Sequence, residues 1–247
     1  MTTKHWLYIA LHAIIFVLGL LAMSQKGVAF QAVGASLIAA GIAGWVIFLY
    51  LFVSSRAAER IALIESSGIR EVFAHRSIAI RHKYELRVKK AREAIDIIGY
   101  GLRALREDLG AEFEAWSQRV NVRILLIDPD FPDPNNSLAD LRDAEEKNPK
   151  DSIRQDVRSF VSQCAELIKG NARFRIRLYR AIPAINYFRV DDEAFWGPFF
   201  VGAQSRNMPA FLIERAGFLF QPLHEHFESL WSDQFSREIP VEWLSNK

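Results

Sequence analysis

Few residues of this chain have the types and spacing that catalysis or metal binding requires. The only cysteine, Cys164, excludes an intramolecular disulfide and falls on an apolar helical stripe, as a small core residue would. His224 and His226 stand two positions apart, and Glu225 and Glu228 add carboxylates nearby. Residues i and i+2 of a helix point to different faces, so we interpret this group as surface polarity and expect no metal.

The glycines around Tyr100 are a second candidate for chemistry. Gly99-Tyr100-Gly101 follows a short apolar segment that is expected to form a strand. The triplet lacks the third glycine of a dinucleotide-binding fingerprint, so we expect no cofactor. A tight turn whose amides face a site is the interpretation that we favour.

Arginines near the strand predicted at Ile185 to Val190 are the third candidate. Arg189 and Arg180 can each hold a phosphate through bidentate hydrogen bonds. The alternative for Arg189 is a structural ion pair with an aspartate, either Asp128 or one of Asp191 and Asp192. The sequence does not choose between these two interpretations.

The elements that position these residues begin with two uncharged segments. Val28 to Val53 has twenty-six residues and Trp6 to Met23 has eighteen, against about 20 that span a bilayer. Only four residues separate them, so residues 1–53 are predicted to form a transmembrane helical hairpin. The remaining chain is long enough for one ordinary domain. A net charge of +2 gives no direct indication of nucleic-acid binding.

Basic residues predict the orientation of this hairpin. Its turn has one lysine, whereas several cations follow the second segment: Arg56, Arg60, Arg70, Arg76, Arg81 and Lys83. Cytoplasmic loops carry such an excess, so we expect a multi-pass protein of the cell inner membrane with both termini in the cytoplasm. The alternative for Trp6 to Met23 is a cleaved signal peptide, which would still leave the C-terminal part inside.

Small residues recur at every fourth position of the second segment, at Ala32, Ser36, Ala40 and Gly44. Such a stripe lets another helix approach closely, and we favour the first segment of the same hairpin as that helix. Association between protomers, and therefore a homo-oligomer, is the alternative. His12 is a polar group at depth and so a functional candidate, but near an interfacial end flanked by Trp6 and Tyr8 we favour simple hydration.

A charged, helical region follows from Ser54, with residues 54–65 as a helical linker and residues 66–247 as the cytosolic domain. Ile80, Tyr84, Val88 and Ala91 form one apolar stripe of a helix whose other faces are basic. Those basic faces either bind anionic headgroups or are simply solvated.

The pattern then changes to that of an α/β domain. Helices are predicted at 102–120, at 151–169 with Asp151 or Ser152 as its cap, and near the C-terminus. The segment 131–151 is predicted to be a polar loop. Strands are predicted at 94–100, 122–127, 173–179, 185–190, 194–200 and 211–214.

Several of these segments, in this order, resemble the phospholipase D-like domains of prokaryotic regulatory and defence-associated proteins. They read GIREVFAHR, AREAIDIIGYGL, VRILLIDPD, FRIRLYRAIPAINYFRVDDEAFWGPFF and LHEHFESLWSDQF. The resemblance covers residues 66–235. It implies a mixed sheet between helices, with the ligand or catalytic site where strand ends meet.

The chain departs from the catalytic members of that family. They carry His-x-Lys followed by an aspartate, and the histidine forms a phosphoenzyme. This chain has no His-x-Lys, and Asn186 or Tyr187 stands where the nucleophile is expected. An amide is not nucleophilic, and a phenol with a pKa near 10 is mostly protonated at neutral pH. We therefore expect no catalytic residue and a site that still binds, formed by Asn186, Tyr187, Arg189, Arg180, Asp128 and Tyr100.

Three functions remain open from the sequence. The favoured hypothesis is a membrane-anchored, non-enzymatic sensor or effector, which binds a nucleotide, another phosphorylated ligand or a partner and signals to the hairpin. The resemblance allows a role in antiviral defence. The alternatives are a membrane-bound phosphodiesterase or phospholipid-processing enzyme, which loses activity in Arg189→Ala or Tyr187→Phe, and a scaffold that mainly dimerises.

Overall fold

The computed structural model describes residues 3–76 and 78–245. The chain divides into two compact units, Met1–Ile64 and Glu65–Lys247. The side chain of Arg56, one of the cations used to predict orientation, lies outside the described residues.

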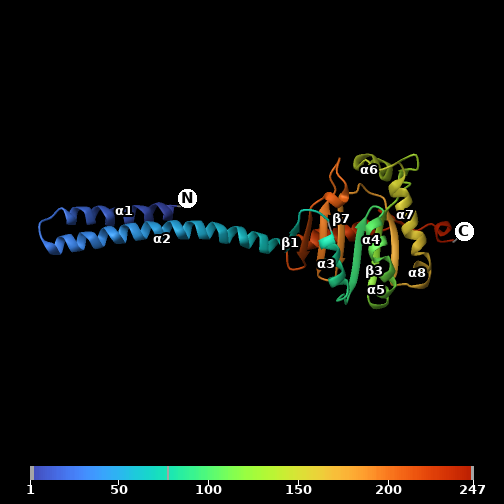
Figure 1. Ribbon diagram of the computed structural model, residues 1–247, viewed down its shortest axis with the longest axis horizontal. Coiled ribbons are helices and arrows are strands. Elements are labelled where there is room, and N and C mark those ends of the chain that lie inside the picture. Colours follow the sequence, from blue (N-terminus) through green and yellow to red (C-terminus); the bar gives the residue numbers. More distant parts are fainter. Residues whose placement is uncertain (1–2, 77, 246–247) are drawn as a thin grey trace. The chain divides into compact units, whose positions relative to one another are not determined.

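The first unit contains two antiparallel helices, α1 (Thr3–Met23) and the part of α2 (Val28–Ser67) that precedes residue 65 (Figure 1). The chain reverses direction just before α2, at Gly27, where φ is 132°, a backbone conformation that favours glycine. The helix α2 continues without a break through residues 54–65, so the linker is helical, as predicted.

Glycines bring these two helices together. Gly34 lies against Met23 and Gly44 against His12, and a Cβ added at Gly44 would lie 1.6 Å from Cδ2 of the histidine. Trp45 Nε1 donates a hydrogen bond to a backbone carbonyl of α1 at 3.4 Å. The close approach of the two backbones therefore depends on residues without side chains.

The predicted small-residue stripe is not the contact surface. Ala32, Ser36 and Ala40 are exposed, and only Gly44 of that series is buried against α1. A helix repeats every 3.6 residues, so a strict spacing of four drifts around its axis. The prediction that this stripe packs on the first segment is therefore wrong for three of its four members.

His12 lies in the contact between the two helices. Its Nδ1 donates to the backbone oxygen of Tyr8 at 3.0 Å, and the two rings stack with centroids 4.2 Å apart. The ring therefore packs between the two backbones, and hydration at an interfacial end does not describe its environment.

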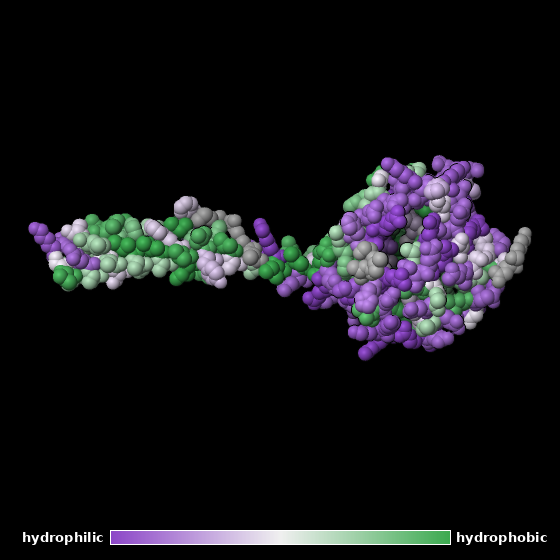
Figure 2. Space-filling view, in the orientation of Figure 1, coloured by the Kyte–Doolittle hydropathy of each residue, from purple (hydrophilic) through white to green (hydrophobic). Residues whose placement is uncertain are grey.

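The outer surface of the first unit is apolar. Figure 2 shows green and white residues along much of this helix pair. Large side chains face outward, among them Leu7 at 74% exposure and Tyr50 at 72%. By length and composition, both helices are long and apolar enough to cross a membrane.

Eight strands of the second unit form one mixed sheet, in the order β1-β9-β8-β7-β2-β3-β6-β10. In chain order they are β1 (Ile69–Phe73), β2 (Ala94–Gly99), β3 (Asn121–Ile127), β6 (Phe174–Tyr179), β7 (Ile185–Val190), β8 (Glu193–Pro198), β9 (Ala210–Glu214) and β10 (Ser236–Glu238). The central strands β2, β3 and β6 are parallel, and every other pairing in this sheet is antiparallel. The short strands β4 (Pro132–Asp133) and β5 (Asn136–Ser137) pair separately.

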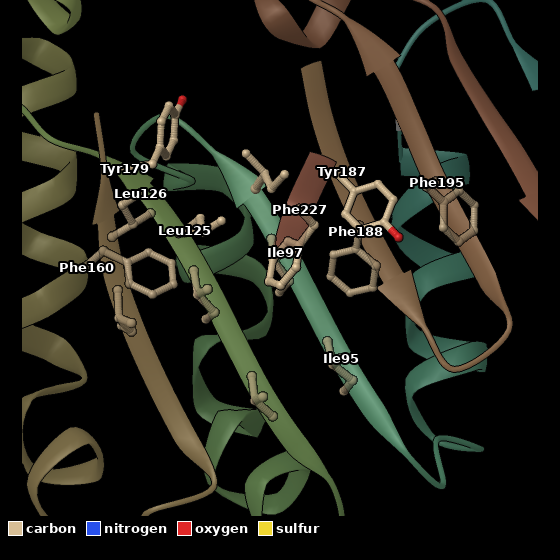
Figure 3. Packing of buried hydrophobic residues seen from close by; sticks show 14 of the residues in the cluster. Ile95, Ile97, Leu125, Leu126, Phe160, Tyr179, Tyr187, Phe188, Phe195 and Phe227 are labelled. Atoms are coloured by element: carbon tan, nitrogen blue, oxygen red, sulfur yellow. The ribbon is translucent and has the colours of Figure 1, made fainter. Parts of the chain in front are cut away.

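Helices cover both faces of this sheet. On the face that we call the α3 face, Tyr84 of α3 (Ile78–Val88) stacks on Phe188 of β7 at 4.3 Å. On the α9 face, Tyr187 of β7 lies 6.1 Å from Phe227 of α9 (Phe220–Trp231). Figure 3 shows the buried side chains along these strands. The other helices are α4 (Arg103–Leu109), η1 (Gly110–Glu112), α5 (Phe113–Arg119), α6 (Leu138–Glu146), α7 (Ser152–Gln163), α8 (Ala165–Gly170), η2 (Ser205–Asn207) and α10 (Val241–Leu244).

Strand β1 corrects the prediction of a helical region from Ser54 onward. Gly68, with φ of 81°, ends α2, and the next five residues alternate between half-buried and exposed as they pair with β9. Helical sequence patterns precede and follow these five residues, so their short strand-like alternation is not recognised in the sequence. The three-residue strand β10 was not predicted either, because it is too short to show a period.

Helix α6 corrects the prediction of a polar loop. Ser137 and Asp140 form a capping box, in which each side chain binds the other residue's backbone N–H. The helix buries Arg142 and Asp143 rather than an apolar stripe, which is why periodicity misses it. Asp143 in turn accepts from the backbone N–H of Ile153 at the start of α7.

The predicted helix 151–169 is observed as α7 and α8, which meet at Cys164. Neither predicted residue caps the N-terminus of α7 with its side chain. Asp151 adopts a left-handed backbone with φ of 64°, and the Ser152 hydroxyl donates to the Pro149 carbonyl. The carboxylate of Asp143, from another helix, supplies the acceptor instead.

Candidate functional site

A cavity of about 930 Å³ opens on the α3 face, at the carboxyl end of β2. Its walls come from segments far apart in the sequence, including Gly99 and Tyr100 after β2, Asn186 of β7 and Ser205 of the β8–β9 loop. In open α/β sheets, ligands bind beyond the carboxyl ends of the parallel strands. This position is where the strand-end argument from the sequence expected a site.

Arg76 lines this cavity and lacks a carboxylate partner among the described residues. Its Nη2 donates to the backbone oxygen of Pro198 at 3.2 Å, and its Nε is buried without a hydrogen-bond partner. The guanidinium also stacks 5.2 Å from the ring centroid of Phe199. Burial lowers its pKa, because removal from water disfavours the charged form. An anion in the cavity would supply the missing charge partner.

Tyr100 lies beside this cation. Burial raises its pKa well above the ordinary value, so its hydroxyl stays protonated. The ring packs 4.2 Å from Phe199, and the buried guanidinium of Arg142 lies 5.2 Å from the Tyr100 centroid. A protonated phenol is a hydrogen-bond donor, and therefore suits an anionic oxygen.

Asn186 completes the polar wall. Its amide donates to the Ile98 carbonyl at 3.3 Å, and its side chain shares the α3 face with Phe188, two positions along β7. Side chains alternate between the faces of a strand, so Tyr187 and Arg189 point to the α9 face. The structure therefore brings Asn186 and Tyr100 to one cavity and separates Tyr187 and Arg189 from them.

Arg189 belongs to a buried ion network under α9. Its Nη1 donates to Asp96 at 2.5 Å and its Nε to the Asp191 carbonyl at 2.7 Å. Arg123 donates to the other oxygen of Asp96 and binds Glu228 through both its Nη atoms. The structural ion pair that the sequence left open is thus formed, with Asp96 in place of Asp128, Asp191 or Asp192.

Tyr187 lies in the same region but has no polar contact there. Its hydroxyl is buried without a hydrogen-bond partner among the described residues. Burial raises its pKa, so the nucleophilic phenolate is disfavoured further.

A group of metal-ligating residue types occurs in this network. Ligand atoms of Asp96, His224 and Glu228 lie within 4.8 Å of one another. The carboxylate oxygens are already occupied by guanidinium groups, whose positive charge opposes a cation. The sequence interpretation missed this group because it considered His224 with His226, whereas the i,i+4 pair His224 and Glu228 faces the sheet.

Arg180 and Asp128 form a third, separate cluster. Asp128 is 1% exposed and accepts from Arg180 at 2.8 Å and from Arg237 at 2.7 Å. The six residues predicted as one ligand site therefore lie at three places, and only Asn186 and Tyr100 line the cavity.

Arg76 and Arg206 are cavity residues that the sequence did not single out. Arg206 also lacks an ion pair among the residues described, and its backbone oxygen accepts from Arg76 N–H at 3.1 Å. Their positions, 130 residues apart, give no local signal. In the sequence, Arg76 stands out only as one of the cations that predict orientation and as part of the FAHR segment.

Comparison with known proteins gives no family. No protein-family model and no curated protein matches the chain. TrmBL2, an archaeal chromatin protein, is similar at 14% identity over 83% of this chain and 70% of its own, with a TM-score of 0.47. NucT from Helicobacter pylori aligns at 10% identity over 68% of this chain and 98% of its own, with a TM-score of 0.41.

A phosphatidylserine synthase from Haemophilus influenzae Rd KW20 aligns at 12% identity over 68% of this chain and 38% of its own, with a TM-score of 0.44. All three TM-scores lie below 0.5, so these similarities assign neither an activity nor a ligand to the chain. The site must be interpreted from its own chemistry.

Proposed function

We propose that this protein is a membrane-anchored binding protein whose second unit takes a phosphate-bearing ligand in the cavity at Arg76. The observation that carries the proposal is the half-buried guanidinium itself. Its buried Nε has no hydrogen-bond partner, and the group has no carboxylate partner, among the described residues. Burying an unpaired charge is costly, and a bound anion removes that cost.

The surroundings of Arg76 suit a phosphate. Arg206 adds a second cation, Tyr100 a protonated hydroxyl and Asn186 an amide. Guanidinium groups bind phosphate oxygens through charge-assisted hydrogen bonds. A cavity of about 930 Å³ lies within the range of small-molecule sites and is much larger than one phosphate group, so the ligand is an organic phosphate or a polyphosphate.

The lining residues favour binding over catalysis. No histidine or cysteine is among the described residues that line the cavity, and Ser205 lies next to no general base other than Glu146, which holds it by two hydrogen bonds. A nucleophile needs an activating neighbour, and an arrangement that lacks one supports a binding role. The order of the sequence motifs and the mixed sheet support a phospholipase D-like domain without its catalytic motif.

The first unit supports the membrane anchor. Two antiparallel helices with outward apolar side chains suit a bilayer, and the excess of basic residues after α2 suits cytoplasmic termini. Arg76 lies between β1 and α3, and β1 follows directly on α2. This adjacency along the chain supports a sensor in which ligand binding at Arg76 acts on the segment that leads to the anchor.

The test is a thermal-shift screen of the full chain in detergent micelles against pyrophosphate, nucleotides, cyclic nucleotides and phosphorylated lipid headgroups. A ligand present at 100 times its Kd stabilises the folded state by about 2.7 kcal/mol. Arg76→Gln should abolish the shift. Arg81→Gln is the matched control, because Arg81 also lines the cavity but pairs with Asp108 and Glu85.

Two results would count against the proposal. One is a shift that persists in Arg76→Gln, which would move the site elsewhere. The other is the absence of any shift across the screen. Turnover of a tested phosphodiester by the wild type would instead favour the enzyme alternative.

A further inference from the structure

One carboxylate links the cavity wall to the β8–β9 loop, residues 199–209. Oε1 of Glu146, at the C-terminal end of α6, accepts from the backbone N–H of Ser205 at 3.1 Å and from the Ser205 hydroxyl. Glu146 and Ser205 both line the cavity. Both of these hydrogen bonds of Ser205 depend on the same carboxylate.

Arg142 fixes that carboxylate. Its Nε and Nη2 donate to Glu146 Oε1 at 3.0 and 2.6 Å, and its Nη1 and Nη2 donate to the carbonyls of Phe200 and Ala203 at 3.0 and 3.1 Å. Only 3% of Arg142 is exposed. We call Glu146, Arg142 and Ser205 the latch.

Arg76 contacts the same loop and the end of β8, and its backbone N–H donates to the Arg206 carbonyl. It donates to the Pro198 carbonyl, stacks on Phe199 and receives no salt bridge from the described residues. Glu146 is the acidic residue whose charge acts on Arg76, and Arg142 is the cation that acts against it. An anion bound to Arg76 therefore lies in the field of the latch carboxylate.

We propose that Glu146 is an internal counter-anion that latches the β8–β9 loop, and that an anionic ligand at Arg76 weakens this latch. The proposal deepens the proposed function and rests on it, because it assigns a regulation to the same site. Like charges repel strongly in a partly desolvated cavity. A bound phosphate therefore destabilises the carboxylate of Glu146 in its latched position, and the latched carboxylate weakens phosphate binding. Ligand occupancy and loop opening are coupled through this repulsion, and the coupling is reciprocal.

The loop is built to move once released. Gly202 has φ of 78° at its tip, and Phe200 and Val201 expose 50% and 79% of their surface instead of packing on the core. The short helix η2 is its only regular element among the described residues. Phe199 and Met208 pack at the two ends of the loop, whereas the exposed side chains of Phe200 and Val201 add little apolar contact between them. The latch hydrogen bonds therefore contribute much of what opposes opening of the middle of the loop.

The first arm of the test is amide hydrogen exchange of the full chain in detergent micelles. Glu146→Gln keeps the shape of the side chain and removes its charge, so amides of residues 199–208 should exchange about tenfold faster. Ser205→Ala should do the same to a smaller extent. Glu145→Gln is the matched control, since Glu145 also pairs with Arg142, whereas the hydrogen bonds of Ser205 go to Glu146.

The second arm measures pyrophosphate binding by calorimetry. Glu146→Gln should bind pyrophosphate about five- to tenfold more tightly, whereas Glu145→Gln should change the affinity less than about twofold. In the wild type, pyrophosphate should speed exchange of residues 199–208.

Four results would overturn the proposal. Unchanged loop exchange in Glu146→Gln would show that the carboxylate does not hold the loop, and acceleration that extends through β7 and β8 would show a general loss of stability. If pyrophosphate binds the wild type without changing loop exchange, the coupling fails and the proposed function stands. If pyrophosphate binds neither protein and no organic phosphate shifts the wild type, the proposed function fails and the coupling fails with it.

Discussion

Asp96 and Arg189 lie directly opposite each other on the antiparallel strands β2 and β7, and they form an ion pair at 2.5 Å with 0% and 7% of their side chains exposed. The pair faces α9, whereas the cavity opens on the other face of the same two strands. Arg189 is therefore part of the interior, and Arg76 is the cation that we propose to bind a ligand. Five predictions follow from this division and from the contacts around it.

Arg189→Ala should reduce the free energy of unfolding by about 3–5 kcal/mol, because it leaves Asp96 buried with one of its two guanidinium partners missing. Chemical denaturation of the full chain in micelles measures this change. Arg70→Ala is the control, since the pair of Arg70 with Glu214 is on the surface and should contribute little. Equal losses in the two variants would contradict the assignment of a buried network.

Arg76→Met should leave the free energy of unfolding unchanged or raise it by up to about 1 kcal/mol, because it removes a desolvated cation without a carboxylate partner. The same denaturation experiment decides this. A loss of 2 kcal/mol or more, on the order expected for a broken buried pair, would mean that Arg76 has a structural partner.

Tyr187→Phe should not destabilise the domain, because the hydroxyl that it removes is buried without a hydrogen-bond partner. Thermal unfolding of the variant beside the wild type checks this expectation. Tyr187→Ala serves as the contrast, since it also removes the ring that packs near Phe227 and should cost about 3–5 kcal/mol. Destabilisation by Tyr187→Phe would reveal a polar role for the hydroxyl.

The stability of the second unit should fall as the pH falls from about 7 to about 5. Burial, and then the charge of Arg189, lower the pKa of His224 below its ordinary value of 6.5. Below that value the unfolded chain takes up a proton more readily than the folded one, so protonation favours unfolding.

Thermal unfolding at about pH 7.5 and at about pH 5.5, one value on each side of the ordinary histidine pKa, measures this dependence. His224→Gln should reduce the difference between the two melting temperatures. His82→Gln, which changes an exposed imidazole, should preserve it. A pH dependence that is identical in all three proteins would remove His224 as its source.

Gly44→Leu should separate the helices of the first unit, because the new side chain would occupy the position of the His12 ring. Ala40→Leu is the control, since Ala40 is exposed and points away from α1. Distances between spin labels on α1 and α2, measured in micelles, should increase in the first variant only. An increase in both would indicate that Ala40 also lies in a helix contact.

The sequence by itself determined the elements with strong periods. Two apolar helices joined by a short turn, the continuous linker helix, the buried parallel strands and the β7–β8 hairpin all follow from local patterns that burial imposes on long segments. Absence of the His-x-Lys motif is likewise a sequence fact. These features were predicted with their boundaries within a few residues.

Only the tertiary structure decided which residues meet. A strand alternates its side chains between two faces, so the neighbours Asn186 and Tyr187 went to different environments, although the sequence placed them in one site. Arg76 and Arg206 come together because β1 and the β8–β9 loop end at the same side of the sheet. Helix α6 was hidden because it buries Arg142 and Asp143, whose burial is stabilised by partners from distant segments. Charge pairing between such segments leaves no periodic trace in the sequence. This pairing separates the structural arginines from Arg76 and Arg206, which line the cavity without an ion pair among the described residues.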